Sequence, residues 1–329
     1  MVFCFIFYLL IDLTNLKISK KIKLPLFPVD KVEWDGRENF YILNSKKNIL
    51  LKIDTVGNIL DTFIKGEGYE IGKSKFLSDI VYDDKGKIIL VSDFILKRIY
   101  KFDEDGKFIN TFIIDELFGN IRVLDDTIFI RCIKEDKIID SFSYSAFLIK
   151  KIDKKDGRFF NNVVKVVMNR KIDVFFSMPF CIDTKEKLIY MIFPFNNIEV
   201  RKLNGDLIKK IIKDKWIYIV DIFLLDKYLV ISSFSENERE YIPGEMLDYW
   251  KSVSLTEPVR EEILKRKLFK VKGKNSHDLE KISYVIDIFD FKNEKFIIEN
   301  YFPKGKLVLG KKDKLFFICR DTLLIYKLK

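Results

Sequence analysis

Short apolar runs separated by turn residues follow one another along the chain. The pattern is clearest at residues 79–113, where four such runs occupy residues 79–82, 88–91, 98–102 and 108–112. The first and third connections, at residues 83–86 and 103–106, each end in glycine, which tolerates the positive φ of tight turns. No helix-length period of 3.6 residues lies between these runs. The pattern predicts a four-stranded antiparallel meander, which is one blade of a β-propeller.

The same unit recurs at nearly constant spacing. An apolar run that contains a lysine and ends shortly before a glycine appears at Lys52, Lys101, Lys151 and Lys202, with steps of 49, 50 and 51 residues. Two weaker copies follow, with Ile288 and Lys327 at the lysine position. Self-similarity at this period is typical of propellers and solenoids. Since the units are built from strands, six copies predict an all-β, six-bladed β-propeller.

Residues 66–113 resemble a known type of repeat. The Ser92-Asp93 pair after an apolar strand, the Arg98-Ile99 pair and the turn from Phe102 to Phe108 are similar to the NHL repeat of bacterial six-bladed propellers. The resemblance is weaker over residues 30–65 and 173–213. Propellers of this family include binding modules and several types of enzyme, so the resemblance implies a fold and does not select a function.

The last repeat supplies only three strands, within residues 306–329, before the sequence ends. A strand-like segment at residues 16–24 precedes the first full repeat. We expect this segment to complete the sixth blade as its outer strand, because closing the ring removes exposed sheet edges. The predicted organisation is an apolar segment at residues 1–15 and one propeller domain at 16–329, interrupted by an insertion at 234–280.

The insertion has a helical pattern. Thr256 is a candidate N-cap, Val259, Ile263 and Leu264 form a narrow apolar face, and a second short helix is expected over residues 245–253. It interrupts the fifth blade between its second and third strands. Two interpretations remain open: a lid or partner-docking arm, and a cover for an apolar patch of its own blade.

The run Met1–Ile11 consists of apolar residues. Eleven residues are too few to span a bilayer, which needs about 20 in a helix. The run resembles the apolar region of a secretory signal but lacks a basic start and a small-residue cleavage site, and the alternative is a first buried strand. We therefore expect no transmembrane helix, and favour a cell-envelope or secreted location over a cytoplasmic one.

Composition narrows the chemistry. His277 is the only histidine, which argues against histidine-bound zinc, and the four cysteines form no CxxC pair. Cys132 and Cys319 lie in apolar runs, as buried thiols do. The net charge of +10 could attract nucleic acid, yet the lysines are scattered along the chain rather than clustered. The sequence thus carries no strong nucleic-acid signal.

Candidate ligand-binding residues lie near the predicted strand ends, where side chains can approach the central mouth of a propeller. They are Asp79, Asp93, Arg122, Arg131, Asp183 and Asp221. Some propeller lactonases hold calcium with acidic and amide side chains at this mouth, and oxygen atoms are the ligands that calcium requires. The alternative is that the aspartates cap turns by accepting backbone hydrogen bonds, and that the two arginines make ion pairs at the rim.

No catalytic constellation emerges from these residues. The sequence therefore favours a monomeric, non-enzymatic propeller that binds a protein or a small molecule and needs no cofactor. A calcium-dependent hydrolase or lactonase with mouth carboxylates is one alternative. A nucleic-acid-binding propeller of the NHL type is the other, and it would require clustered basic residues with exposed aromatic side chains on one face.

Overall fold

A computed structural model of the chain describes residues 16–26, 28–139, 142–169, 179–193, 197–212, 219–226, 228–234, 284–301, 303 and 305–328. The apolar run at 1–11, the predicted helices of the insertion, and His277 lie outside these ranges.

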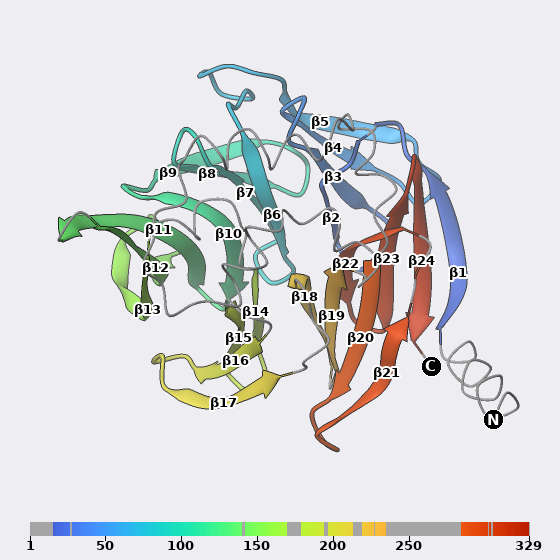
Figure 1. Ribbon diagram of the computed structural model, residues 1–329. Coiled ribbons are helices and arrows are strands. Elements are labelled where there is room, and N and C mark those ends of the chain that lie inside the picture. The colour runs from blue at the N-terminus through green and yellow to red at the C-terminus, as the bar shows by residue number, and fades with distance from the viewer. Residues whose placement is uncertain are drawn as a thin grey trace, which may run out of the picture.

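Six four-stranded antiparallel sheets surround a central axis as the blades of a propeller (Figure 1). The first blade contains β2 (Lys31–Trp34), β3 (Phe40–Asn44), β4 (Ile49–Ile53) and β5 (Ile59–Lys65). The second contains β6 (Leu77–Asp83), β7 (Ile88–Asp93), β8 (Arg98–Asp103) and β9 (Phe108–Ile113). The third contains β10 (Leu117–Leu124), β11 (Thr127–Ile139), β12 (Phe142–Asp153) and β13 (Phe159–Asn169).

The remaining blades follow the same order from the axis outward. The fourth contains β14 (Phe180–Asp183), β15 (Leu188–Phe193), β16 (Asn197–Lys202) and β17 (Leu207–Ile212). The fifth contains β18 (Ile219–Leu225), β19 (Tyr228–Phe234), β20 (Tyr284–Asp290) and β21 (Lys295–Tyr301). The sixth contains β22 (Lys306–Lys311), β23 (Lys314–Cys319), β24 (Thr322–Leu328) and, from the other end of the sequence, β1 (Leu16–Lys23). The all-β, six-bladed fold expected from the repeat is therefore confirmed.

The expected closure of the ring is confirmed as well. Strand β1 pairs antiparallel with β24, with Leu16 opposite Leu328 and Lys23 opposite Thr322. Figure 1 shows the two strands, blue and red, side by side at the rim. Ile22 is 1% exposed and packs in the cluster between the sixth and first blades. The N-terminal strand thus contributes core side chains as well as backbone pairing.

The core lies between neighbouring blades rather than at the axis. One cluster joins Tyr41 and Leu50 of the first blade to Ile89 and Tyr100 of the second, and Tyr41 stacks on Tyr82 with ring centroids 5.7 Å apart. Each blade buries side chains on both faces, so its strands are apolar at consecutive positions, as in the fully buried β7. The stacking of neighbours, rather than any one blade, forms the hydrophobic core.

The repeated lysine and glycine have separate structural roles. Lys52 donates from Nζ to the Glu104 carbonyl of the next blade at 2.7 Å, and Lys101 donates to the Lys154 carbonyl of the blade after it at 3.1 Å. Gly57 has φ +107°, and a Cβ there would lie 2.2 Å from the Lys23 carbonyl oxygen of the preceding blade. The repeat motif therefore marks contacts between blades.

The two faces of the propeller carry different connections between strands. Turns between first and second strands lie on one face, and connections between second and third strands lie on the other, because the four strands alternate in direction. Residues 235–283 connect Phe234 of β19 to Tyr284 of β20, which are paired in register at the second face. The insertion therefore leaves and re-enters the propeller on that face.

Candidate ligand site in the central channel

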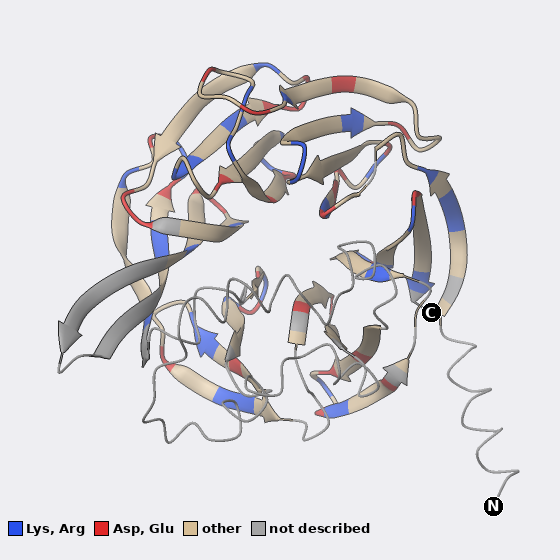
Figure 2. Ribbon diagram, turned by 45° about the horizontal axis from the view of Figure 1, so that its top comes forward, with Lys and Arg blue, Asp and Glu red and all other residues tan. Residues whose placement is uncertain are grey.

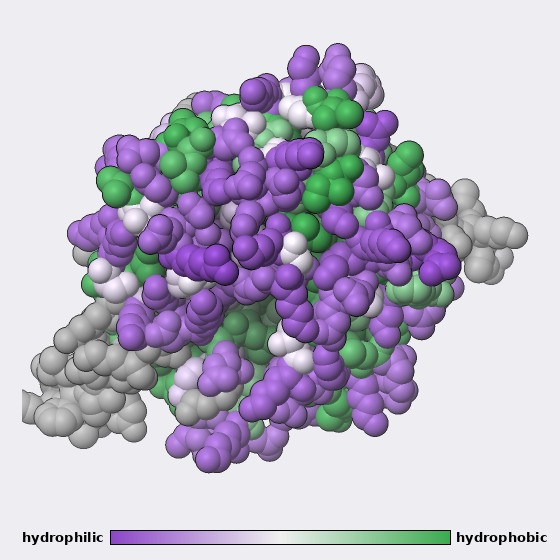
Figure 3. Space-filling view, turned by 180° about the vertical axis from the view of Figure 1, so that it is seen from behind, coloured by the Kyte–Doolittle hydropathy of each residue, from purple (hydrophilic) through white to green (hydrophobic). Residues whose placement is uncertain are grey.

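A pocket of about 420 Å³ lies on the propeller axis. The innermost strands of all six blades form its wall, through β2, β6, β10, β14, β18 and β22. Thr184, Lys185, Asp226 and Lys312, from turns between first and second strands, also line it. The mouth is therefore on the face opposite to the ends of the 235–283 connection. Figure 3 shows a hollow at the centre of a largely hydrophilic face, with hydrophobic residues inside it.

The fold places backbone groups on this wall. Each innermost strand is paired on one side only, with the second strand of its own blade. Its other edge faces the axis, so part of the wall consists of N–H and C=O groups outside the sheet ladders. Such groups, with a few charged side chains, give a pocket directional hydrogen bonding.

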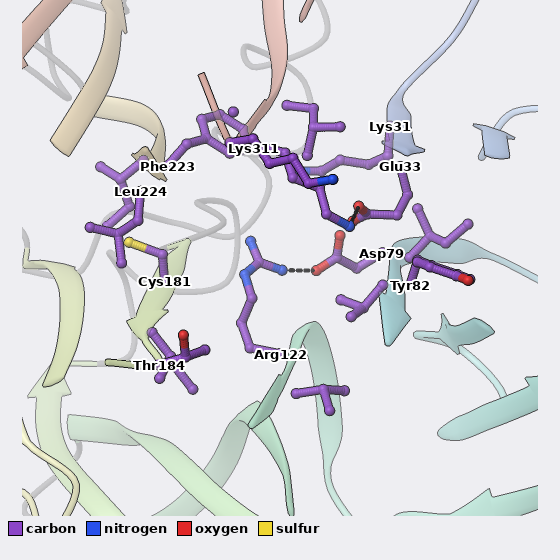
Figure 4. Close-up of a pocket in the computed structure, with 18 of the residues that line it drawn as sticks. Lys31, Glu33, Asp79, Tyr82, Arg122, Cys181, Thr184, Phe223, Leu224 and Lys311 are labelled. Carbon is purple, nitrogen blue, oxygen red and sulfur yellow. Dashed lines mark hydrogen bonds and ion pairs between the residues drawn. The ribbon is translucent and has the colours of Figure 1, made fainter. Parts of the chain in front are cut away.

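An arginine–aspartate pair crosses the pocket floor between the second and third blades. Arg122 of β10 donates from Nη1 to Oδ2 of Asp79 at 2.8 Å and to the Ile121 carbonyl at 2.6 Å. Asp79, whose side chain is 3% exposed, also accepts from the Ile121 N–H at 3.1 Å. Figure 4 shows the Arg122 side chain reaching the centre of the pocket between Asp79 and Cys181.

A second ion pair connects the first and fifth blades. The Nζ of Lys31 lies 2.8 Å from Oδ2 of Asp221, and the two side chains are 21% and 7% exposed. Burial alone would lower the pKa of Lys31, but the carboxylates of Asp221 and Asp79 more than compensate and raise it. Lys31 is therefore held in its charged form beside the pocket.

A third basic residue, Lys306, lies near Lys31 and Asp221. Lys306 begins β22, in the sixth blade, and its side chain makes no hydrogen bond or ion pair with any residue in the described part of the chain. Burial lowers the pKa of its ammonium group, and the charge of nearby Lys31 lowers it further. The carboxylates of Asp30, Asp79 and Asp221 lie near this group of three cations.

Closer to the mouth, Lys311 joins the sixth blade to the first. Its Nζ lies 3.0 Å from Oε1 of Glu33, donates to the Trp34 carbonyl at 2.7 Å, and lies 5.4 Å from the centroid of the Tyr82 ring. Burial and the Glu104 carboxylate raise the pKa of Tyr82 to about 12. At neutral pH this tyrosine is a neutral hydrogen-bonding group at the edge of the pocket.

The fourth blade contributes Cys181, which is 6% exposed and lines the pocket. Burial raises the pKa of its thiol well above the ordinary value, in spite of the opposing effect of Arg122. The thiol is therefore neutral at physiological pH, and since the thiolate is the reactive form, Cys181 is a poor nucleophile.

Of the six candidate residues from the sequence, four lie at or beside the pocket and two do not line it. Asp79, Arg122 and Asp183 line the pocket, and Asp221 is bound to Lys31, which also lines it. Asp183 accepts the N–H groups of Lys185 and Glu186 at 2.8 Å, so it caps its turn.

Asp93 and Arg131 are not among the residues that line the pocket. Asp93 is fully buried and accepts the N–H groups of Lys75 and Leu96 at 2.8 and 2.9 Å, which fixes the loop between the first two blades. Arg131 lies in the second strand of the third blade, where its Nη1 donates to Asn120 at 3.3 Å.

Sequence reasoning missed Lys31, Lys306, Glu33 and Lys311. A signal was available for the first two, because each lysine stands at the start of a predicted innermost strand. Among the described residues, no three histidine, cysteine or acidic side chains are grouped as metal ligands. Among the described residues, Lys and Arg are interspersed with Asp and Glu around the ring (Figure 2). In the described part of the chain no helix has the length and apolar character needed to cross a membrane.

Comparison with known proteins supports the fold and goes no further. No family model and no curated protein matches the chain. Among solved structures, the chain is similar to one described as a "Putative exported protein" from Bacteroides fragilis, with 12% sequence identity, a TM-score of 0.55 and coverage of 96% of each chain. In all, 994 solved chains match, so the architecture is widespread and does not by itself select a function.

Proposed function

We propose that this protein is a non-enzymatic propeller that binds a small molecule in its axial pocket. The observation that carries the proposal is that the innermost strands of all six blades form the wall of one cavity of about 420 Å³. This volume is within the range of small-molecule sites, which are concave and contain a few convergent polar groups. Arg122, Lys31 and Asp79 are such groups, and hydrogen bonds and ion pairs to neighbouring blades orient them.

The chemistry of the pocket favours binding over catalysis. The buried carboxylates Asp79 and Asp221 are each bound to a cation, and the thiol of Cys181 is neutral. Activated nucleophiles and general bases instead need a partner that increases their reactivity. The calcium-dependent alternative receives less support, because the floor carboxylates Asp79 and Asp221 are each already bound to a basic side chain.

The test is a thermal-shift screen of the full chain with a panel of small molecules and with calcium. A ligand that binds only the folded protein raises the unfolding midpoint by mass action. Thr184→Trp should abolish the shift, because Thr184 is an exposed residue that lines the pocket. Lys155→Trp, in an exposed turn outside the pocket, is the matched control and should keep it.

The same screen separates the alternatives. A compound that stabilises the parent and the Lys155 variant but not the Thr184 variant supports the axial site. Equal shifts in all three proteins contradict it. A calcium-dependent rise that Asp79→Asn removes would favour the hydrolase alternative.

Protein recognition is a second candidate, favoured by one exposed apolar surface. Tyr69, Ile71, Phe76 and Ile95 are between 43% and 70% exposed in the connections at residues 66–76 and 94–97. Both connections lie on the face opposite to the pocket mouth, so the two functions do not compete for one surface. The double variant Tyr69→Ser, Ile71→Ser should weaken the binding of a protein partner and leave small-molecule binding intact.

Export to the cell envelope or beyond accompanies this proposal. Its support is the apolar run Met1–Ile11 and the similarity to the Bacteroides fragilis structure, whose name describes an exported protein. Fractionation of bacterial cells that express the full chain tests it. Export predicts the protein in the envelope or the medium, and recovery from the cytoplasm alone would contradict it.

A further inference from the structure

We infer that the ligand of the axial pocket carries a carboxylate group, which binds to the free edge of the Arg122 guanidinium with Lys306 and Lys31 nearby. This inference rests on the proposed small-molecule function and specifies the chemistry of the ligand. It follows from the hydrogen bonding of Arg122, from the basic side chains of Lys31 and Lys306 near the pocket floor, and from the size and wall of the cavity.

Arg122 uses only part of its hydrogen-bonding capacity. Both of its bonds, to Asp79 and to the Ile121 carbonyl, come from Nη1. Its Nη2 and Nε donate to no residue in the described part of the chain, and neither is an enclosed, unsatisfied atom. Figure 4 shows this side of the guanidinium facing the open centre of the pocket. Two parallel N–H donors at that edge match the two oxygens of a carboxylate.

Asp79 prepares this edge for a ligand. Its Oδ2 accepts from Nη1 of Arg122 and from the Ile121 N–H, so the carboxylate is itself fixed by the backbone of the neighbouring blade. The guanidinium is therefore held in one orientation before a ligand arrives. A preoriented fork loses less conformational entropy on binding than a mobile one.

The charges near the pocket floor limit how much negative charge a ligand can bring. Lys31, Lys306 and Arg122 carry three positive charges, and the nearby Asp30, Asp79 and Asp221 carry three negative ones. In the described part of the chain no anion is paired with the Lys306 side chain, and its pKa is lowered by burial and by Lys31. A bound anion would stabilise the charged form of Lys306. A carboxylate supplies one negative charge, whereas a phosphate monoester brings nearly two at neutral pH.

The cavity is larger than a carboxylate alone requires. Its wall also contains the apolar residues Val123, Val308 and Leu309 together with strand edges. A ligand that fills about 420 Å³ therefore has a body beyond its charged group. The body would contact the apolar side chains and the backbone groups near the mouth, while the carboxylate lies at the floor beside Arg122.

The test uses a minimal pair of probes that differ in charge. Trifluoroacetate is a small carboxylate, and trifluoroethanol is its neutral counterpart. The ¹⁹F linewidth of each is followed with the full chain at constant ionic strength. The parent protein should broaden the trifluoroacetate signal in a saturable way and leave trifluoroethanol sharp, whatever the natural ligand body is.

Two variants locate the effect. Arg122→Lys keeps the positive charge but removes the paired N–H donors of Nη2 and Nε. It should weaken the binding of trifluoroacetate about tenfold, the effect of losing one charge-assisted hydrogen bond. Lys306→Met should weaken it about fivefold or more, since it removes a nearby charge without breaking an ion pair. Lys155→Met, at an exposed turn, should leave binding unchanged.

The outcomes separate the carboxylate assignment from the existence of the axial binding site. No saturable broadening by trifluoroacetate, or broadening that both variants retain, would overturn the carboxylate assignment. Tighter binding of inorganic phosphate in a ³¹P measurement would also overturn it. If neutral compounds in the thermal-shift screen still bind in a way that Thr184→Trp prevents, the axial site stands and only its ligand chemistry is wrong.

Discussion

The Nζ of Lys31 lies 2.8 Å from Oδ2 of Asp221, although 190 residues separate the two in the sequence. The pair joins the first blade to the fifth and so passes the sixth blade, which lies between them in the ring. It brings together opposite charges that the chain can align only after the ring has closed. The pocket floor is therefore a product of the complete propeller rather than of any single blade.

Breaking this pair should destabilise the fold. Lys31→Met leaves the Asp221 carboxylate buried without its partner, and we expect a loss of about 3–5 kcal/mol in the free energy of unfolding. The double variant Lys31→Met, Asp221→Asn should recover a large part of that loss. Denaturant unfolding measures both. Lys85→Met is the control, because its pair with Asp125 is exposed and should contribute less than about 1 kcal/mol. Equal losses for Lys31→Met and Lys85→Met would contradict this account.

The N-terminal strand should be essential for stability. Ile22 is 1% exposed in β1, and Ile22→Asp places a charge in the cluster between the sixth and first blades. We expect a loss of at least about 3 kcal/mol, or failure to fold. A chain that begins at residue 28 should lose stability in the same way. Lys21→Ser, an exposed position of the same strand, should change the midpoint little. An unchanged midpoint for Ile22→Asp would show that closure by β1 is unimportant.

The repeated lysines should differ in their contribution to stability. Lys52→Met removes a charged donor from the Glu104 carbonyl of the next blade, and we expect a loss of about 1.5–3 kcal/mol. Lys202 holds the equivalent position in the fourth blade but is exposed, and Lys202→Met should change the free energy of unfolding by less than about 0.5 kcal/mol. Thermal and denaturant midpoints compare the two. If both variants behave alike, the lysine does not act by linking blades.

Lys306 should reduce stability at neutral pH, because its pKa in the folded protein is below the ordinary value of 10.5. At pH values below that lowered pKa the full penalty is present. As the pH rises from there toward 10.5, the folded state loses this proton before the unfolded state does, so stability increases. Burial and then the charge of Lys31 lower the pKa of Lys306, while Asp30 and Asp221 partly offset them.

Lys306→Met should therefore be more stable than the parent at neutral pH, by about 1 kcal/mol. The advantage should shrink as the pH approaches 10.5. Urea unfolding of both proteins at a series of pH values measures this difference. A variant that is less stable than the parent, or a difference that grows with pH, would contradict the electrostatic account of the channel.

The fold could be predicted because the repeat is encoded locally. Lys52, Lys101, Lys151 and Lys202 lie in the third strands of four blades, and the weaker copies at Ile288 and Lys327 lie in the third strands of the other two. The number of copies of one motif thus predicted the number of blades. The placement of β1 followed from the missing fourth strand of the last repeat. The resemblance to NHL repeats remains a prediction, because no family model matches the chain.

The site could be predicted only in part, because its residues are set by the ring rather than by local sequence. Asp79, Arg122 and Asp183 were found from their positions near strand ends. Asp93 has the same kind of position, but it ends a second strand and is directed to the loop between blades. Lys306 looks like any other lysine in a lysine-rich chain. Its role depends on Lys31, which is distant in sequence and comes near it only when the sixth blade packs against the first.

The most direct test of the axial site is a crystallographic fragment screen of the full chain, with carboxylates and their neutral counterparts in the same set. The account predicts fragment density in the pocket formed by the six innermost strands, with carboxylate oxygens at the Nη2 and Nε edge of Arg122. Fragments that gather only on outer strands or on the connection at residues 66–76, with the axial pocket left to solvent, would contradict it.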